Sequence, residues 1–155
     1  MSSDPGKVSI YTGGREIRAS AIDNSAYAKA GGVSIDWTTV AANGSNTTLA
    51  DGTIVPAGTK YILWGTVLSR ITASGKFGPA DTSAADGRQT VTNAKRGEAF
   101  ILDRLITEAE YSSNVVGDVF DGGNFFESRL LIGGANQPTR QNLVDMFPNV
   151  TFTKD

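Results

Sequence analysis

Glycine and proline interrupt this sequence so often that mainly short strands and turns fit between them. The chain holds 18 Gly and 5 Pro among its 155 residues. Residues 33–38 alternate strictly and would place Val33, Ile35 and Trp37 on one face of a strand. Residues 60–72 give the strongest strand signal, and Gly65 marks either a bulge or a break into two strands. Many short strands joined by glycine turns predict an all-β fold.

Two later segments are harder to assign from periodicity. Residues 98–110 fit a helix, and a buried strand over 99–105 fits as well. One face of that helix would carry Phe100, Ile101, Leu105 and Ile106. Residues 114–120 and 124–132 resemble a β-hairpin joined across residues 121–123 (DGG). The strand and helix readings of residues 98–110 both stay open at this level.

The end of the chain, residues 133–155, indicates a short helix followed by a strand. Pro138 suits the first helical position, and Leu143, Met146 and Phe147 then share one helical face. Pro148 ends the helix, and the residues after it suit a last short strand. We expect a short C-terminal helix packed through its apolar face.

The first 32 residues differ in composition from the rest. They are rich in Gly, Ser and Ala, and few of them are large enough to bury much surface: Val8, Ile10, Tyr11, Ile17, Ile22 and Tyr27. Residues 7–12 alternate like a strand, so this region is either a disordered tail or an arm that adds a strand to a partner's sheet. We therefore divide the chain into an N-terminal arm, residues 1–32, and a β-rich domain, residues 33–155.

The absence of Cys and His excludes most familiar catalytic chemistry. A Ser-His-Asp triad, a thiolate nucleophile and a standard zinc site all need one of them. Asp81 and Asp86 suit loop caps better than a calcium loop, and Asp103, Glu108 and Glu110 suit a solvated surface better than a glycosidase pair. We expect no enzyme activity, no cofactor and no metal.

The remaining composition narrows the partners. Lys and Arg total 14 against 16 Asp and Glu, so the chain lacks the basic excess typical of nucleic-acid binding. The N-terminus has no signal-peptide pattern, and the longest apolar run, residues 61–64, is too short to span a bilayer. We expect synthesis in a cytoplasm and no membrane partner.

Several stretches together resemble one protein family. They are residues 55–59 (VPAGT), 65–81 (GTVLSRITASGKFGPAD), 84–90 (AADGRQT) and 100–103 (FILD). This order of turn, strand, Gly-Lys-aromatic turn and polar loop is similar to the lambda-type head decoration proteins of tailed phages. The match favours a strand over residues 99–105. The chain departs from the family pattern by extra polar residues at 93–98 and by longer ends.

The resemblance implies a fold, a location and partners. It implies a small β-barrel or β-tulip-like domain that forms a homotrimer on the outer surface of an expanded head, at three-fold or quasi-three-fold sites. The arm would pair with the major capsid protein through Lys7, Val8, Ile10, Tyr11 and Ile17. The trimer interface would include Trp64, Phe77 and Pro79. The protein would then be a virion component made in the host cytoplasm.

One alternative from another class stays open. Trp37, Tyr61, Trp64 and Phe77 would form a sugar-stacking platform if they were exposed, and the protein would then be a β-rich receptor- or glycan-binding module. Aromatic residues at alternating strand positions are more often found in a core or a subunit interface.

Overall fold

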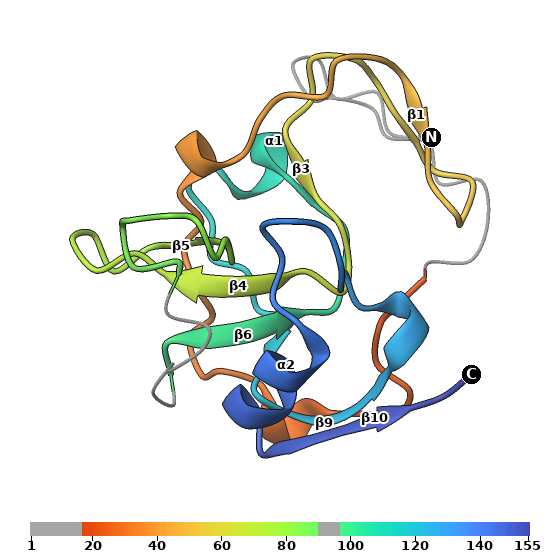
Figure 1. Ribbon diagram of the computed structural model, residues 1–155. Helices are drawn as coiled ribbons and strands as arrows, with labels where there is room; N and C mark the ends of the chain where they lie inside the picture. Colours follow the sequence, from red (N-terminus) through yellow and green to blue (C-terminus); the bar gives the residue numbers. More distant parts are fainter. Residues whose placement is uncertain (1–16, 90–96) are drawn as a thin grey trace.

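The computed structural model describes residues 17–89 and 97–155, which form mainly short strands with two short α-helices (Figure 1). The strands are β1 Thr47–Thr48, β2 Ile54–Val55, β3 Tyr61–Ile62, β4 Val67–Arg70, β5 Phe77–Pro79, β6 Ala99–Leu102, β7 Ile106–Thr107, β8 Val119–Phe120, β9 Gly122–Phe126 and β10 Asn149–Thr153. The helices are α1 Glu108–Tyr111 and α2 Arg140–Met146, with 3-10 turns η1 Ser25–Tyr27, η2 Trp37–Thr39 and η4 Glu127–Arg129. The all-β prediction is confirmed. The described strands do not close into a barrel, because they are divided among four separate sheets.

The largest sheet has four strands in the order β5-β4-β6-β8, and every neighbouring pair is antiparallel. The other strands form three two-stranded sheets. β1-β2 and β3-β7 are antiparallel, and β9-β10 is parallel. In Figure 1, β4 and β6 cross the middle of the molecule, and β9 and β10 run side by side below them.

The four-stranded sheet is buried on both faces. On one face, Val67, Ile101 and Phe120 pack in a cluster that also contains Leu143 and Phe147 from the α2 region. On the other face, a second cluster contains these residues: Val33, Ile35, Trp37, Ile62, Leu68, Phe77, Phe100, Leu102, Ile106, Val116 and Val119. Burial on both sides explains why all four residues of β6 are apolar and buried. The strand reading of this segment is therefore correct, and a short α1 follows β7 further along.

Gly65 separates β3 from β4, as the break into two strands requires. Its φ is 82°, and a Cβ at this position would lie 2.0 Å from the carbonyl oxygen of Arg129. The amide of Gly65 donates to Leu102 O at 2.8 Å, and its own carbonyl accepts from Leu131 N at 3.1 Å. The chain can turn here and stay close to two neighbouring backbones only because the side chain is missing.

The predicted face of residues 33–38 is correct, whereas the predicted strand is wrong. Val33, Ile35 and Trp37 are all buried. Val33 and Ile35 form only isolated bridges, to Val116 and Phe77, and η2 begins at Trp37. The side chain of Asp36 accepts from Thr38 N at 3.1 Å, which caps the 3-10 turn and ends the extended backbone.

The predicted hairpin between residues 114–120 and 124–132 is wrong. β8 pairs with β6, and β9 pairs with β10, so the two segments enter different sheets. Gly122 and Gly123 are not turn residues but the first residues of β9. A Cβ on Gly122 would lie 2.2 Å from the Tyr27 ring, so the missing side chain allows Tyr27 to pack closely against β9.

The C-terminal predictions are confirmed, with one small shift. α2 begins one residue after Thr139, which is its N-cap, so Pro138 lies just before the helix rather than in its first turn. Leu143 and Phe147 are buried, and Met146 packs against the same cluster. β10 then follows as the predicted last strand, and α2 lies close to it (Figure 1).

Candidate functional site

The predicted capsid-contacting residues fall mostly before the described part of the chain. Lys7, Val8, Ile10 and Tyr11 lie outside the described residues, and their role stays a prediction. Ile17 is the first described residue and is half-buried. The site that the structure does show is the segment that follows it, residues 17–33, and the surface on which this segment lies.

This segment begins as an antiparallel addition to β9. Ser20 is bridged to Phe125, Phe126 N donates to Ala19 O at 2.8 Å, and Ala21 N donates to Asn124 O at 2.9 Å. Ala19 is completely buried in the cluster on the α2 side. Residues 19–21 thus occupy the edge of β9 that β10 leaves open. The division between arm and domain at residue 32 stays a prediction, but these residues pack against the domain.

A second set of contacts holds the segment further on. The side chain of Asn24 is buried and bonds both backbone groups of Asn124: its Nδ2 donates to the carbonyl at 3.1 Å, and its Oδ1 accepts from the amide at 3.1 Å. Lys29 N donates to Val119 O at 3.1 Å, and Val33 then bridges Val116. Ile22 and Tyr27, expected to be the large buried residues here, are 58% and 41% exposed. The segment is held mainly by backbone hydrogen bonds and by small or polar side chains.

The carboxylate of Asp103 holds the segment in place through hydrogen bonds. Asp103 follows β6 directly and is 1% exposed. Ser20 N donates to its Oδ1 at 2.8 Å, and Ser20 Oγ donates to its Oδ2 at 2.5 Å. Arg18 Nη1 lies 3.9 Å from the same Oδ2. The expectation that Asp103 lies on a solvated surface with Glu108 and Glu110 is wrong for Asp103, because its side chain is buried and accepts hydrogen bonds from Ser20.

Partly exposed charged side chains lie between the buried carboxylate of Asp103 and the surface. Arg18 and Arg104 lie 4.0 Å and 3.4 Å from Asp118, whose carbonyl accepts from Asp103 N at 2.9 Å. A groove of about 400 Å³ opens beside Ser20 and Asp103, and residues 20–25 and 117–118 form its rim. These ion pairs are partly exposed and contribute little to stability, so the hydrogen bonds to Ser20 are the main contacts of the Asp103 side chain.

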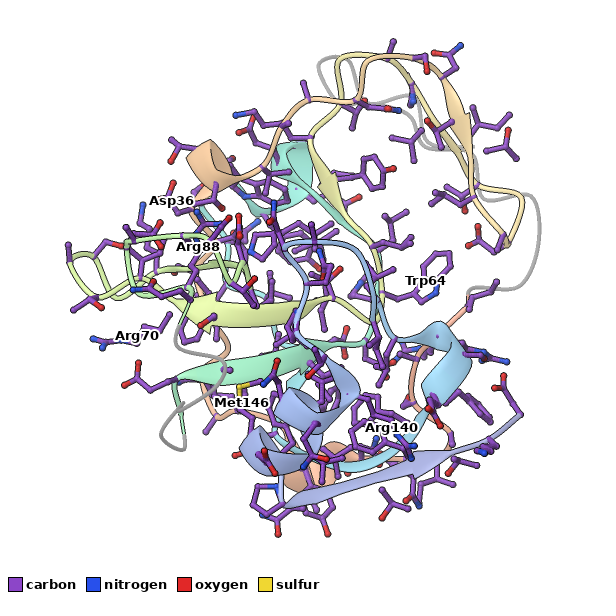
Figure 2. All side chains as sticks on the ribbon, in the orientation of Figure 1. Asp36, Trp64, Arg70, Arg88, Arg140 and Met146 are labelled. Carbon is purple, nitrogen blue, oxygen red and sulfur yellow. The ribbon has the colours of Figure 1, made fainter. Side chains whose placement is uncertain are left out.

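Asp81 and Asp86 accept hydrogen bonds from nearby loop residues, as the loop-cap interpretation predicted, and Asp36 does the same at η2. The hydroxyl and the amide of Ser83 lower the pKa of Asp81, and those of Thr38 lower the pKa of Asp36 in the same way. Burial raises the pKa of Asp86, but the amide and guanidinium of Arg88 outweigh burial and lower it. Asp36 and Arg88 lie on the same side of the molecule, above β4 (Figure 2). Within residues 17–89 and 97–155, no group of three or more acidic side chains could hold a metal ion.

Of the four aromatic residues in the sugar-stacking alternative, Tyr61 is half-buried and the other three are buried. Trp37, Trp64 and Phe77 are 6%, 5% and 4% exposed, so they do not form an exposed stacking platform. Figure 2 shows Trp64 near the turn between β3 and β4, and Pro79 in β5 is half-buried. Trp64, Phe77 and Pro79 stay a prediction as trimer-interface residues, since the structure of one chain does not test an interface. No helix in the described ranges has the length and apolar character needed to cross a bilayer.

The fold and this site define an all-β protein whose first described segment is held against β9 and Asp103. Residues 34–93 match the family model described as bacteriophage lambda head decoration protein D, a family of structural phage proteins. The match confirms the resemblance to the lambda-type head decoration family and supports a phage capsid decoration protein. No curated protein and no solved structure matches the chain. The matched residues include η2 and β1 to β5, whereas Ser20 and Asp103 lie outside them.

Proposed function

We propose that this protein decorates the outer surface of an expanded phage head as a homotrimer and stabilises the shell. Three-fold or quasi-three-fold sites are its places of attachment, and the major capsid protein is its partner. The family match over residues 34–93 is the observation that carries the proposal. The role needs no catalytic chemistry and no cofactor, and the protein is made in the host cytoplasm before it joins the virion.

The arm supplies the contact with the capsid in this proposal. A segment containing Val8 and Ile10 adds a strand to the edge of a capsid-protein sheet. Ordering the segment costs about 1–2 kcal/mol per residue, and burying Val8 and Ile10 returns about 1.5–3 kcal/mol each. One arm therefore binds weakly. Three arms on one trimer gain roughly 10²–10⁴-fold from effective concentration, so the trimer is a functional requirement.

Stabilisation follows from cross-bridging. Each trimer contacts several capsid subunits, so pressure inside the shell must break many contacts at once. The fastening of residues 19–21 to β9 and Asp103 supports this role, because it joins the arm to the central sheet.

Co-sedimentation of the purified full chain with phage heads tests the proposal. We expect the protein to pellet with expanded heads and not with precursor heads, and to behave as a trimer in size-exclusion chromatography with light scattering. Binding to glycans without any binding to heads would contradict it and favour the receptor- or glycan-binding alternative. The burial of Trp37, Trp64 and Phe77 speaks against that alternative.

Removing residues 1–16 is the sharpest test of the arm. Deleting residues 1–20 would also remove Ala19, a buried residue, and Ser20, a partner of Asp103. The shorter deletion keeps these contacts, so we expect an unchanged unfolding midpoint and trimer. Affinity for expanded heads should fall by about 100-fold or more, because the avidity of three arms is lost. Head binding equal to that of the full chain would refute the role of the arm.

A further inference from the structure

We propose that Asp103 is a positioning residue for the N-terminal arm, acting through Ser20. Its buried carboxylate takes the place of a missing neighbouring strand and ties the base of the arm to the end of β6. The inference rests on the proposed function and adds to it a residue pair outside the segment that matches the family.

The pattern of hydrogen bonds explains why the base of the arm needs this carboxylate. Ala19 and Ala21 use their backbone groups toward β9, so Ser20, between them, points its own amide away from β9. An extended strand at a sheet edge leaves such an amide without a strand partner. Asp103 Oδ1 accepts this amide at 2.8 Å. The three-residue strand is therefore bonded on both sides, once by a strand and once by a side chain.

The position of Asp103 connects this contact to the buried four-stranded sheet. It directly follows β6, which lies between β4 and β8 in the four-stranded sheet. Its own amide donates to Asp118 O at 2.9 Å, so its backbone is held as well. A force on the arm would act on Ser20 before it acted on residues 22–33. The contact between Ser20 and Asp103 would transmit this force to the four-stranded sheet.

The chemistry of the contact makes Ser20 sensitive to substitution. A buried carboxylate must receive hydrogen bonds to offset its lost hydration. Ser20 provides two, while Arg18 lies 3.9 Å away from Oδ2, beyond hydrogen-bond distance. Removing the serine hydroxyl thus weakens the attachment of residues 19–21 without creating a cavity, because Ser20 is half-buried beside an open groove.

Ser20→Ala in the full chain is the test, with two readouts. The first is the rate of tryptic cleavage after Arg18, which requires residues 19–21 to leave β9. The second is affinity for expanded heads. We expect cleavage to become about tenfold faster and head affinity to fall about tenfold, since a hydrogen bond to a charged group is lost. The trimer should persist.

Three further variants make the test specific. Ser20→Thr keeps the hydroxyl and should restore both readouts. Asp103→Asn keeps the size of the side chain and should shift both in the same direction as Ser20→Ala. Ser128→Ala removes a matched bond, the 2.5 Å contact from Ser128 Oγ to Asp155 Oδ1, which is exposed and distant in sequence. It should leave both readouts at the level of the unsubstituted chain.

The outcomes separate the inference from the proposed function. Unchanged cleavage after Arg18 in Ser20→Ala would overturn the attachment itself. Faster cleavage with unchanged head affinity would overturn the positioning role and leave the decoration function standing. Failure of the unsubstituted chain to bind heads would reject the proposed function, and the positioning role with it, whatever the cleavage rates show.

Discussion

Gly65 and Gly58 share a left-handed backbone and differ in their surroundings. Their φ values are 82° and 83°. A Cβ on Gly65 would lie 2.0 Å from Arg129 O, whereas a Cβ on Gly58 would have no neighbour within 4 Å. The pair therefore separates the cost of the backbone conformation from the cost of a collision.

We expect Gly58→Ala to lower the free energy of unfolding by about 1–2 kcal/mol, the cost of a left-handed non-glycine residue. Gly65→Ala should cost about 2 kcal/mol more, because the Arg129 backbone must also move. Denaturant unfolding followed by tryptophan fluorescence measures both. Equal losses at the two positions would show that the contact with Arg129 is relaxed at little cost.

Single residues also mark the limit of what the sequence can predict. The break at Gly65 could be inferred, because a glycine inside a strong strand pattern is a local signal. The pairing of Ser20 with Asp103 could not, since 83 positions separate them and each is an ordinary polar residue on its own. Residue size did not predict burial in this segment either: the small Ala19 is completely buried, whereas the larger Ile22 is exposed.

At the scale of elements, α2 depends on its first turn. It is seven residues long, too short to be stable by itself, and it places Leu143 in the core. The hydroxyl of Thr139 accepts from Asn142 N at 3.2 Å, and Asn142 Oδ1 accepts from Thr139 N at 2.9 Å. This reciprocal cap satisfies two amides that the helix leaves unpaired.

Thr139→Ala should therefore lower the free energy of unfolding by about 1 kcal/mol. Thr139→Ser retains the hydroxyl and should remain within a few tenths of a kcal/mol of the unsubstituted chain. Chemical denaturation of the three proteins provides the comparison. A similar loss in the serine variant would assign the effect to the threonine methyl group instead of the cap.

Elements with a local signal were predictable, and their partners were not. α2 and β10 follow from apolar residues and periodicity within a few positions, whereas periodicity left β6 open between helix and strand and only the family resemblance favoured the strand. The hairpin between β8 and β9 failed because adjacent strands usually pair, whereas here each prefers a distant partner. Gly122 and Gly123 looked like a turn, but their missing side chains make room for Tyr27 and Asn24. Sequence patterns report such long-range packing poorly.

For the whole molecule, the family match and the fastened segment lie in different parts of the chain. Residues 34–93 include η2 and β1 to β5, whereas Ser20, Asp103 and β9 lie outside them. The structure joins the two parts, since β4 of the matched region pairs with β6, and Asp103 follows β6. In the proposed function, stable attachment to a shell depends on how the arms and the bodies of one trimer act together.

Mixed trimers test this cooperation directly. Full-length chains and chains lacking residues 1–16 can be co-expressed with different tags and separated into trimers with three, two, one or no arms. The proposed function has each arm bind weakly and gain from the attachment of the others, so affinity for expanded heads should fall in steps of roughly ten- to hundredfold per arm removed. Sedimentation with heads at a range of protein concentrations measures each step. One-armed trimers that bind as tightly as three-armed ones would show that avidity has no part in attachment, and a protein that stays monomeric would remove the trimer from the proposed function.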